Sequence, residues 1–188
     1  MIVQELELPE VKLIVPTYFE DNRGYSTEAY NDRTLREYDI HTRFVVDYVC
    51  CNVSAGTIRG IHFQNNPRPQ TKLVRVLQGE IVDFVIDLRR DSTTYKKWVT
   101  QTLSYENRKQ LYLPSGFGHA YVTTRPNTVV LYKFDDYYDR DLVRAIRWND
   151  PEIALPWGIE RPVLSPADEK APWLSESDVN LSVERNSL

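Results

Sequence analysis

Cysteine, histidine and glycine are scarce in this chain of 188 residues, which contains two, three and seven of them. The two cysteines, Cys50 and Cys51, are neighbours. Adjacent side chains of an extended segment point to opposite faces, so a disulfide between them would be strained. Two thiols are also too few for a structural zinc site made of cysteines alone. We therefore expect both cysteines to be reduced strand residues, as is usual in the cytosol.

Long basic runs and long apolar runs are absent as well. No basic run exceeds two residues, and the net charge of -4 with an isoelectric point near 5.5 argues against nucleic acid as a partner. No apolar run approaches the length needed to cross a bilayer, so no membrane segment is expected. The start, residues 1–7, is acidic and interrupted. We expect no signal peptide and a cytoplasmic protein.

The composition predicts one β-rich domain over residues 1–188. Hydrophobic residues make up 41% of the chain and aromatic residues 12%, with twelve tyrosines, which supports a folded core. Alternation with a period of two is far more common than helical periodicity. Strands are expected at 11–15, 44–51, 57–63, 72–77, 80–88, 98–103, 110–113, 120–124 and 128–134.

Little helix is expected between these strands. One short helix is predicted at 34–38, capped by Asn31 or Asp32. Many short antiparallel strands with few peripheral helices favour an all-β jelly roll. The segment that begins at Trp148 is expected to wrap the barrel, and residues 178–188 are expected to form a frayed tail.

The segments 72–77 and 80–88 give the clearest hairpin signal, because only a Gln-Gly pair separates two alternating runs. In the second run, Asp83 and Asp87 share one face with apolar side chains. A face that mixes carboxylates with apolar groups fits a cavity lining better than open solvent.

Two of the histidines lie in strand-like segments. A lone strand histidine such as His62 is more often structural than catalytic. Its company favours a site, because Lys72, Tyr132 and His119 occupy comparable β-type segments. His119 ends a Pro-x-Gly-x-x-His pattern typical of cupin barrels, where this histidine often binds a metal. A metal cupin would need a second histidine close to His62, and none is there, so the metal site stays the lesser alternative.

Seven motifs resemble those of the dTDP-4-dehydrorhamnose 3,5-epimerase family, in the same order and with approximately the same spacing from about residue 10 to residue 174. They are 21–28 (DNRGYSTE), 58–64 (IRGIHFQ), 70–75 (QTKLVR), 113–120 (LPSGFGHA), 131–133 (LYK), 148–150 (WND) and 164–168 (LSPAD). The resemblance implies a cupin-type double-stranded β-helix and a homodimer with strand exchange. It also implies a nucleotide-diphosphate sugar substrate of deoxysugar and polysaccharide biosynthesis, with no metal and no organic cofactor.

The resemblance also implies an isomerase that inverts C3 and C5 of a 4-keto-6-deoxy sugar through enolates. Such a reaction needs a base on one face, an acid on the other and a positive group at the enolate oxygen. By motif position His62 is the base and Asp168 holds its other nitrogen, a role that Asp83 is expected to share. Lys72 would stabilise the enolate, and Tyr132 would return a proton.

The same motifs suggest residues that bind the substrate. Arg23 and Arg59 are expected at the diphosphate, because guanidinium suits bidentate phosphate contacts. Glu28 is expected to accept a hydrogen bond from the nucleobase of the substrate, and Tyr138 is expected to stack on that nucleobase. His119 is expected to bind or orient the sugar. The strand that carries Arg23 and Glu28 has no obvious partner in a closed barrel, which also favours strand exchange between two copies.

Departures from the family pattern gather on the nucleotide side. The family's Phe-Phe-x-Glu run is Tyr-Ser-Thr-Glu at 25–28, and its Phe-Val-Gln-Asp-Asn run is Phe-Val-Val-Asp-Tyr at 44–48, which loses a glutamine that contacts the nucleotide. The loop at 48–56 also differs in length. GDP- or CDP-linked sugars therefore remain open, as do single-position epimerisation, ketoisomerisation, a metal-dependent oxygenase and a non-catalytic sugar-binding cupin.

Overall fold

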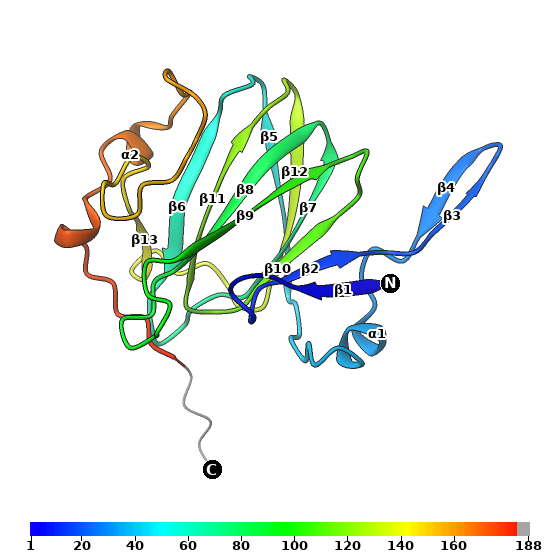
Figure 1. Cartoon of the computed structure of the whole chain (residues 1–188), viewed down its shortest axis with the longest axis horizontal. Coiled ribbons are helices and arrows are strands. Elements are labelled where there is room, and N and C mark those ends of the chain that lie inside the picture. The colour runs from blue at the N-terminus through cyan, green and yellow to red at the C-terminus, as the bar shows by residue number, and fades with distance from the viewer. Residues whose placement is uncertain (184–188) are drawn as a thin grey trace, which may run out of the picture.

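The computed structural model describes residues 1–183 as two antiparallel sheets that face one another, with a small hairpin beside them (Figure 1). In spatial order, the larger sheet contains β1 (Ile2–Glu5), β2 (Lys12–Val15), β10 (Gln110–Leu113), β7 (Lys72–Gln78), β12 (Thr128–Phe134) and β5 (Val46–Asn52). The smaller sheet contains β13 (Val143–Ala145), β6 (Ile58–Gln64), β11 (Phe117–Thr123), β8 (Glu80–Asp87) and β9 (Trp98–Ser104). This arrangement confirms the predicted all-β jelly roll of the cupin, double-stranded β-helix type.

The remaining elements are short and peripheral, as predicted. They are the hairpin of β3 (Tyr18–Asp21) and β4 (Gly24–Thr27), the helices α1 (Asp32–Arg36) and α2 (Pro166–Glu169), and the 3-10 helix η1 (Leu174–Glu176). The predicted helix at 34–38 is α1, and its cap is Asn31, whose side chain accepts from the Thr34 amide. The β3–β4 hairpin extends away from the two sheets (Figure 1).

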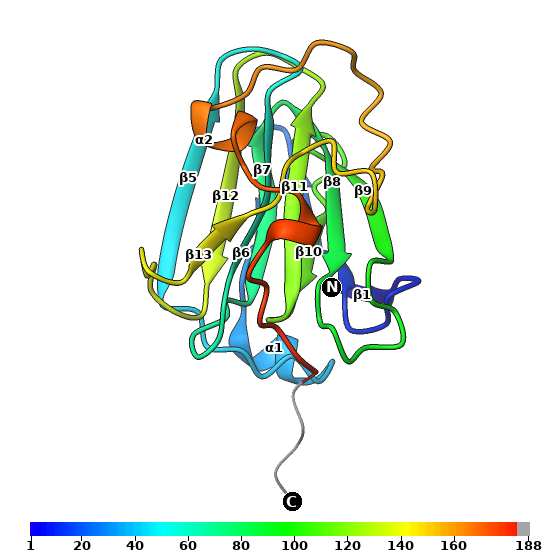
Figure 2. The same cartoon turned by 90° about the vertical axis from the view of Figure 1, so that its left-hand side faces the viewer.

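The main core lies between the two sheets and is built from alternate residues of their strands. Side chains such as Val74, Val85, Leu111 and Val130 are buried there. A second core covers the outer face of the smaller sheet, where the segment after Trp148 packs Ile153, Leu155, Trp157, Leu174, Val179 and Leu181 (Figure 2). The prediction that this segment wraps the barrel is confirmed. A third cluster packs α1 against the larger sheet.

The predicted pairing of 72–77 with 80–88 is wrong. Both strands exist, but β7 pairs with β10 and β12 in the larger sheet, whereas β8 pairs with β9 and β11 in the smaller one. The chain crosses between the sheets at Gly79, whose φ of +78° favours glycine. A Cβ there would lie 2.3 Å from Thr128 Oγ1, so the crossover also depends on the missing side chain.

The prediction of a frayed tail from residue 178 places its start too early in the chain. Val179 and Leu181 are buried in the second core, and Asn180 is bonded to Asn65 and Asn66. Residues 178–183 therefore pack on the barrel, and 184–188 lie outside the described residues. Strands β1, β3, β4 and β13 are additions to the predicted set.

Candidate active site

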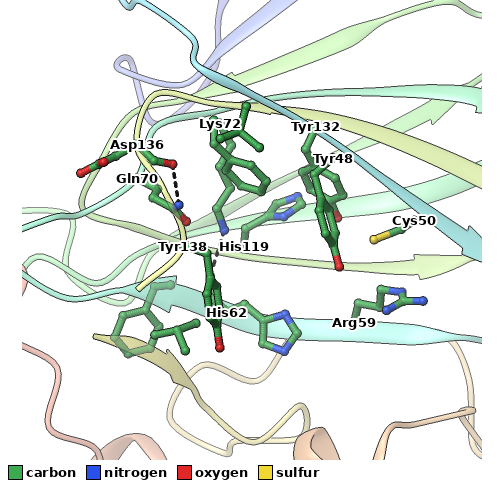
Figure 3. A pocket seen from close by; sticks show the side chains of 14 residues that line it. Tyr48, Cys50, Arg59, His62, Gln70, Lys72, His119, Tyr132, Asp136 and Tyr138 are labelled. Carbon is green, nitrogen blue, oxygen red and sulfur yellow. Dashed lines mark hydrogen bonds between the residues drawn. The ribbon is translucent and has the colours of Figure 1, made fainter. Parts of the chain in front are cut away.

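A cavity of about 370 Å³ opens between the two sheets, beside the edge strand β5 (Figure 3). Its walls come from β5, β6, β7, β11 and β12, together with the segment after β12 and the short strand β13. The lining residues are Val46, Tyr48, Cys50, Arg59, His62, Phe63, Gln70, Lys72, His119, Tyr132, Phe134, Asp136, Tyr138 and Val143.

Strand alternation explains why these side chains meet. Val46, Tyr48 and Cys50 are alternate residues of β5, and Tyr132 and Phe134 are alternate residues of β12. Beyond the cavity, the inward faces of β7 and β12 continue with the buried apolar residues Val74, Val76 and Val130, whereas β5 ends in the buried Asn52. The cavity residues therefore lie next to the apolar core.

His62 and Asp168 form a pair at the cavity wall. His62 Nε2 lies 2.5 Å from Asp168 Oδ1, although the two residues are 106 positions apart. Ser165 caps α2 and donates from Oγ to the other carboxylate oxygen, Oδ2, at 2.9 Å. Asp168 is buried, whereas the His62 side chain is 42% exposed and faces the cavity. The carboxylate thus fixes the imidazole through one nitrogen and leaves Nδ1 for a ligand.

Lys72 lies on β7, opposite His62. Its Nζ donates to the carbonyl oxygen of His62 at 3.3 Å across the space between the sheets (Figure 3). Burial lowers the pKa of Lys72 from 10.5 to about 8, although the nearby carboxylate of Asp83 acts in the opposite direction. The ammonium group is therefore poorly solvated and available to a partial negative charge in the cavity.

His119 pairs with Asp83 behind the cavity surface. His119 Nε2 lies 2.8 Å from Asp83 Oδ2, and both residues are buried. Burial lowers the pKa of His119 and raises that of Asp83, while their mutual contact opposes both shifts. The expectation that Asp83 shares the orientation of His62 is wrong, because its carboxylate contacts His119. Asp83 is not among the side chains that line the cavity.

Tyr132 is buried among aromatic rings. Its ring stacks on Phe134 with centroids 5.6 Å apart and meets the His119 ring edge-on at the same distance. Burial raises the pKa of Tyr132 well above 10, so the phenol keeps its proton at neutral pH. The side chain nevertheless reaches the cavity from the face opposite His62 (Figure 3).

The predicted binding residues separate into two groups. Arg59, His119 and Tyr138 line the cavity, and the Tyr138 side chain is exposed (Figure 3). Arg23 and Glu28 belong to the β3–β4 hairpin region and do not reach this cavity. Arg23 bonds to Asp21, and Glu28 accepts from Asn31. The structure therefore does not bring the whole predicted set together within one chain.

Several lining residues are not singled out by the sequence reasoning. Gln70 lies two residues before Lys72 and Phe134 two residues after Tyr132, so strand alternation is a signal that could have found both. Asp136 and Val143 arrive from the segment after β12 and from β13, where no local pattern indicates the cavity.

The two cysteines are free, as predicted; Cys50 is buried at the cavity wall and Cys51 is exposed. Within residues 1–183, no group of three or more His, Cys, Asp or Glu side chains is placed to hold a metal ion. In the same range, no helix has the length and apolar character needed to cross a bilayer.

Comparisons with protein families, curated proteins and solved structures all match the same family of enzymes. A family model for dTDP-4-dehydrorhamnose 3,5-epimerase matches residues 5–176. The enzyme of that name from Sinorhizobium fredii (strain NBRC 101917 / NGR234) is 39% identical over 181 residues, which cover 96% of this chain and 93% of that protein.

Two solved structures are similar over nearly their whole length. Bacillus anthracis dTDP-4-dehydrorhamnose 3,5-epimerase, with TDP and PPi bound, has a TM-score of 0.90 at 45% identity and covers 92% of this chain and 99% of its own. Legionella pneumophila dTDP-6-deoxy-D-glucose-3,5-epimerase, in complex with dTDP-4-keto-L-rhamnose, has a TM-score of 0.93 at 32% identity. The match covers 98% of this chain and 99% of the Legionella chain.

Proposed function

Because the chain belongs to the dTDP-4-dehydrorhamnose 3,5-epimerase family, we propose that it inverts C3 and C5 of dTDP-4-dehydro-6-deoxyglucose. The observation that supports this best is the cavity itself. It joins a carboxylate-held histidine, a buried lysine and a buried tyrosine, which are the groups that two successive enolisations require.

His62 is the proposed base. The C4 ketone acidifies the hydrogens on C3 and C5, and the Nδ1 atom left free by the bond to Asp168 can take either one. The electron pair of the broken C–H bond moves to the C4 oxygen. The Lys72 ammonium stabilises the enolate oxygen that results, and its burial strengthens this interaction.

Tyr132 is the proposed acid. An enolate that recovers its proton from His62 returns to its starting configuration, so inversion needs a donor on the other face. The Tyr132 phenol is protonated at neutral pH and reaches the cavity opposite His62. Proton removal and proton return leave the oxidation state unchanged, so no redox cofactor is needed. Because Lys72 supplies the positive charge at the enolate oxygen, we propose that neither an organic cofactor nor a metal takes part.

Substrate binding is divided between the cavity and the hairpin. Arg59 is placed to bind the diphosphate and His119 to bind the sugar. The exposed ring of Tyr138 offers a stacking surface for the nucleobase. Arg23 and Glu28 would reach a cavity only as part of a second copy. We therefore include a homodimer in the proposal, and we place the enzyme in the cytoplasm because a charged nucleotide sugar does not cross a bilayer unaided.

The identity of the nucleotide is the least constrained part. Val46 occupies the position of the family's nucleotide-contacting glutamine and lines the cavity. The relatives named above act on or bind dTDP compounds, which supports dTDP. GDP- and CDP-linked sugars are the competing substrates.

The test is product analysis. Purified protein and dTDP-4-dehydro-6-deoxyglucose are combined in deuterated water, after exhaustive chelation, and the sugar is followed by proton NMR. We expect label and inverted configuration at both C3 and C5. Inversion at one carbon only would indicate a single-position epimerase, and turnover of only the GDP- or CDP-linked analogue would reassign the nucleotide. Activity restored only by an added divalent ion would indicate a metal cupin.

A further inference from the structure

The buried side chain of Gln64 holds the backbone on both sides of Tyr138. Gln64 is the last residue of β6 and is not among the side chains that line the cavity. Its Nε2 donates to the carbonyl oxygens of Arg68 at 2.5 Å and Tyr137 at 3.2 Å, and its Oε1 accepts from the Asp139 amide at 2.9 Å. Because Tyr137 and Asp139 are the two neighbours of Tyr138 in the chain, one amide group fixes the segment that carries this ring.

The Tyr138 side chain has little else to hold it. The residue is 68% exposed, and within residues 1–183 its ring stacks on no other aromatic ring and its hydroxyl makes no hydrogen bond. An exposed side chain of this kind takes its position from its backbone and then samples its rotamers. The place of the ring at the cavity therefore depends on what holds residues 137–139.

The other bonds to this segment lie nearer the solvent. Arg68 donates to both carboxylate oxygens of Asp136, at 2.9 and 2.5 Å, and Gln70 donates to the Asp136 carbonyl oxygen at 2.9 Å. The side chains of Arg68 and Asp136 are 39% and 31% exposed, and ion pairs with that exposure contribute little. Gln64 is only 3% exposed, so the loss of its bonds would leave buried polar groups unpaired, which costs more.

Gln64 also connects the nucleotide end of the cavity to the reacting end. It lies two residues after His62 on β6, so the strand that carries the proposed base also holds the backbone of the proposed stacking residue. We propose that Gln64 is a positioning residue that preorganises Tyr138 for the nucleobase, so that the segment need not be ordered when the substrate binds. The inference rests on the proposed function, in which Tyr138 stacks on the nucleobase.

The test is Gln64→Met, which keeps a side chain of similar length and removes its donors and its acceptor. Calorimetry gives the Kd for dTDP, with GDP and CDP titrated in parallel, and the nucleotide that binds most tightly is followed. The Kd should rise about 5- to 150-fold, the range for losing an aromatic stack on a base, and the KM of inversion should rise with it. The kcat should stay unchanged, because the groups that move protons are untouched. The matched control is Gln4→Met, an exposed residue of β1 outside the cavity, which should bind as the wild type does.

A double-substitution cycle with Tyr138→Ala separates positioning from general packing. If Gln64 acts through the Tyr138 ring, adding Gln64→Met to Tyr138→Ala should raise the Kd no further. An equal further rise in the absence of the ring would show that Gln64 supports the cavity as a whole and would overturn the proposal. A Kd of the wild-type value in Gln64→Met, or a fall in kcat as large as the rise in KM, would overturn it as well.

Nucleotide binding and inversion are measured separately, so the two proposals can fail separately. A wild type that binds dTDP but inverts no sugar would refute the proposed epimerisation, while the binding cycle would still decide the role of Gln64. A wild type that binds none of the three nucleotides would refute the stacking role of Tyr138 and the role of Gln64 with it.

Discussion

At the residue scale, the two histidines of the cavity differ in how deeply they are buried. Each faces a carboxylate, but the His119 side chain is 4% exposed whereas that of His62 is 42% exposed. Burial lowers the pKa of His119, which suits a neutral hydrogen-bond donor, while His62 is open to a ligand. The same residue type therefore has two roles, set by depth in the barrel.

Strand alternation predicts which face Asp83 occupies, but it cannot show which residue lies across the sheet. The mixed face of 80–88 points inward, with Ile81, Asp83 and Val85 in the interior, but none of its residues lines the cavity, so the predicted cavity lining is wrong. In the pairing of β8 with β11, Asp83 lies opposite Tyr121, and His119 is two residues before Tyr121 on β11. That register comes from the tertiary fold, so the partner of Asp83 was beyond sequence reasoning.

Activity is expected to fall as the pH rises through about 8, the pKa to which burial lowers Lys72. Below this pH the ammonium stabilises the enolate oxygen, and above it the amine is neutral. Tyr132 does not titrate in this range because its pKa is raised. Initial rates between about pH 6 and pH 10 at saturating substrate measure the effect.

The control for this pH dependence is Lys72→Arg, whose guanidinium stays charged throughout. Whatever activity remains in that variant should show no alkaline fall near pH 8. A wild-type rate that stays level up to pH 10 would exclude Lys72 as the group that must be protonated.

At the scale of elements, the β7–β8 connection shows that a local sequence pattern can predict two strands without predicting whether they pair. A Gln-Gly pair between two alternating runs looks the same whether the strands pair or cross to opposite sheets. Here the crossing is favoured because both strands are buried between neighbours in their own sheets. The tail shows the same limit, since Val179 and Leu181 alternate with polar residues in a stretch too short to show which surface they cover.

The end of β8 is held by a buried ion pair that a substitution can test. Arg89 donates to both carboxylate oxygens of Asp87 at 2.9 and 2.8 Å, bonds to Glu10 and lies over the Phe117 ring. Arg89→Met should lower the free energy of unfolding by about 3–5 kcal/mol, because it leaves a buried carboxylate without its cation.

Urea unfolding of the variant measures this loss, and Arg90→Met is the control, since Arg90 is exposed and its side chain makes a single long bond, to the Ser177 carbonyl oxygen. A loss for Arg89→Met no larger than that of the control would mean that Ser92 and Thr94, which also donate to Asp87, are sufficient.

At the scale of the whole molecule, the proposed dimer explains the position of the β3–β4 hairpin. The hairpin extends from the barrel, with the Arg23 side chain 85% exposed and Phe19 66% exposed (Figure 1). The motif at 21–28 was recognised from the sequence, but a single chain cannot show which cavity it serves.

Mixing two inactive variants tests this dimer. If each hairpin completes the cavity of the other copy, His62→Ala combined with Arg23→Ala should recover about one quarter of wild-type activity after subunit exchange, because half of the dimers then contain one intact site. No recovery, although mass measurement shows mixed dimers, would mean that each hairpin serves its own chain. An Arg23→Ala variant that is fully active by itself would mean that the hairpin serves no cavity. A fully active monomer in light scattering would exclude the dimer.

Deuterium labelling of the sugar separates the two proposed proton transfers. With dTDP-4-dehydro-6-deoxyglucose in deuterated water, the wild type should label and invert C3 and C5. Tyr132→Phe should label them with little inversion, because its ring remains but its proton is gone. His62→Ala should give essentially no label at either carbon. Labelling by His62→Ala at the wild-type rate would contradict the assignment of His62 as the base.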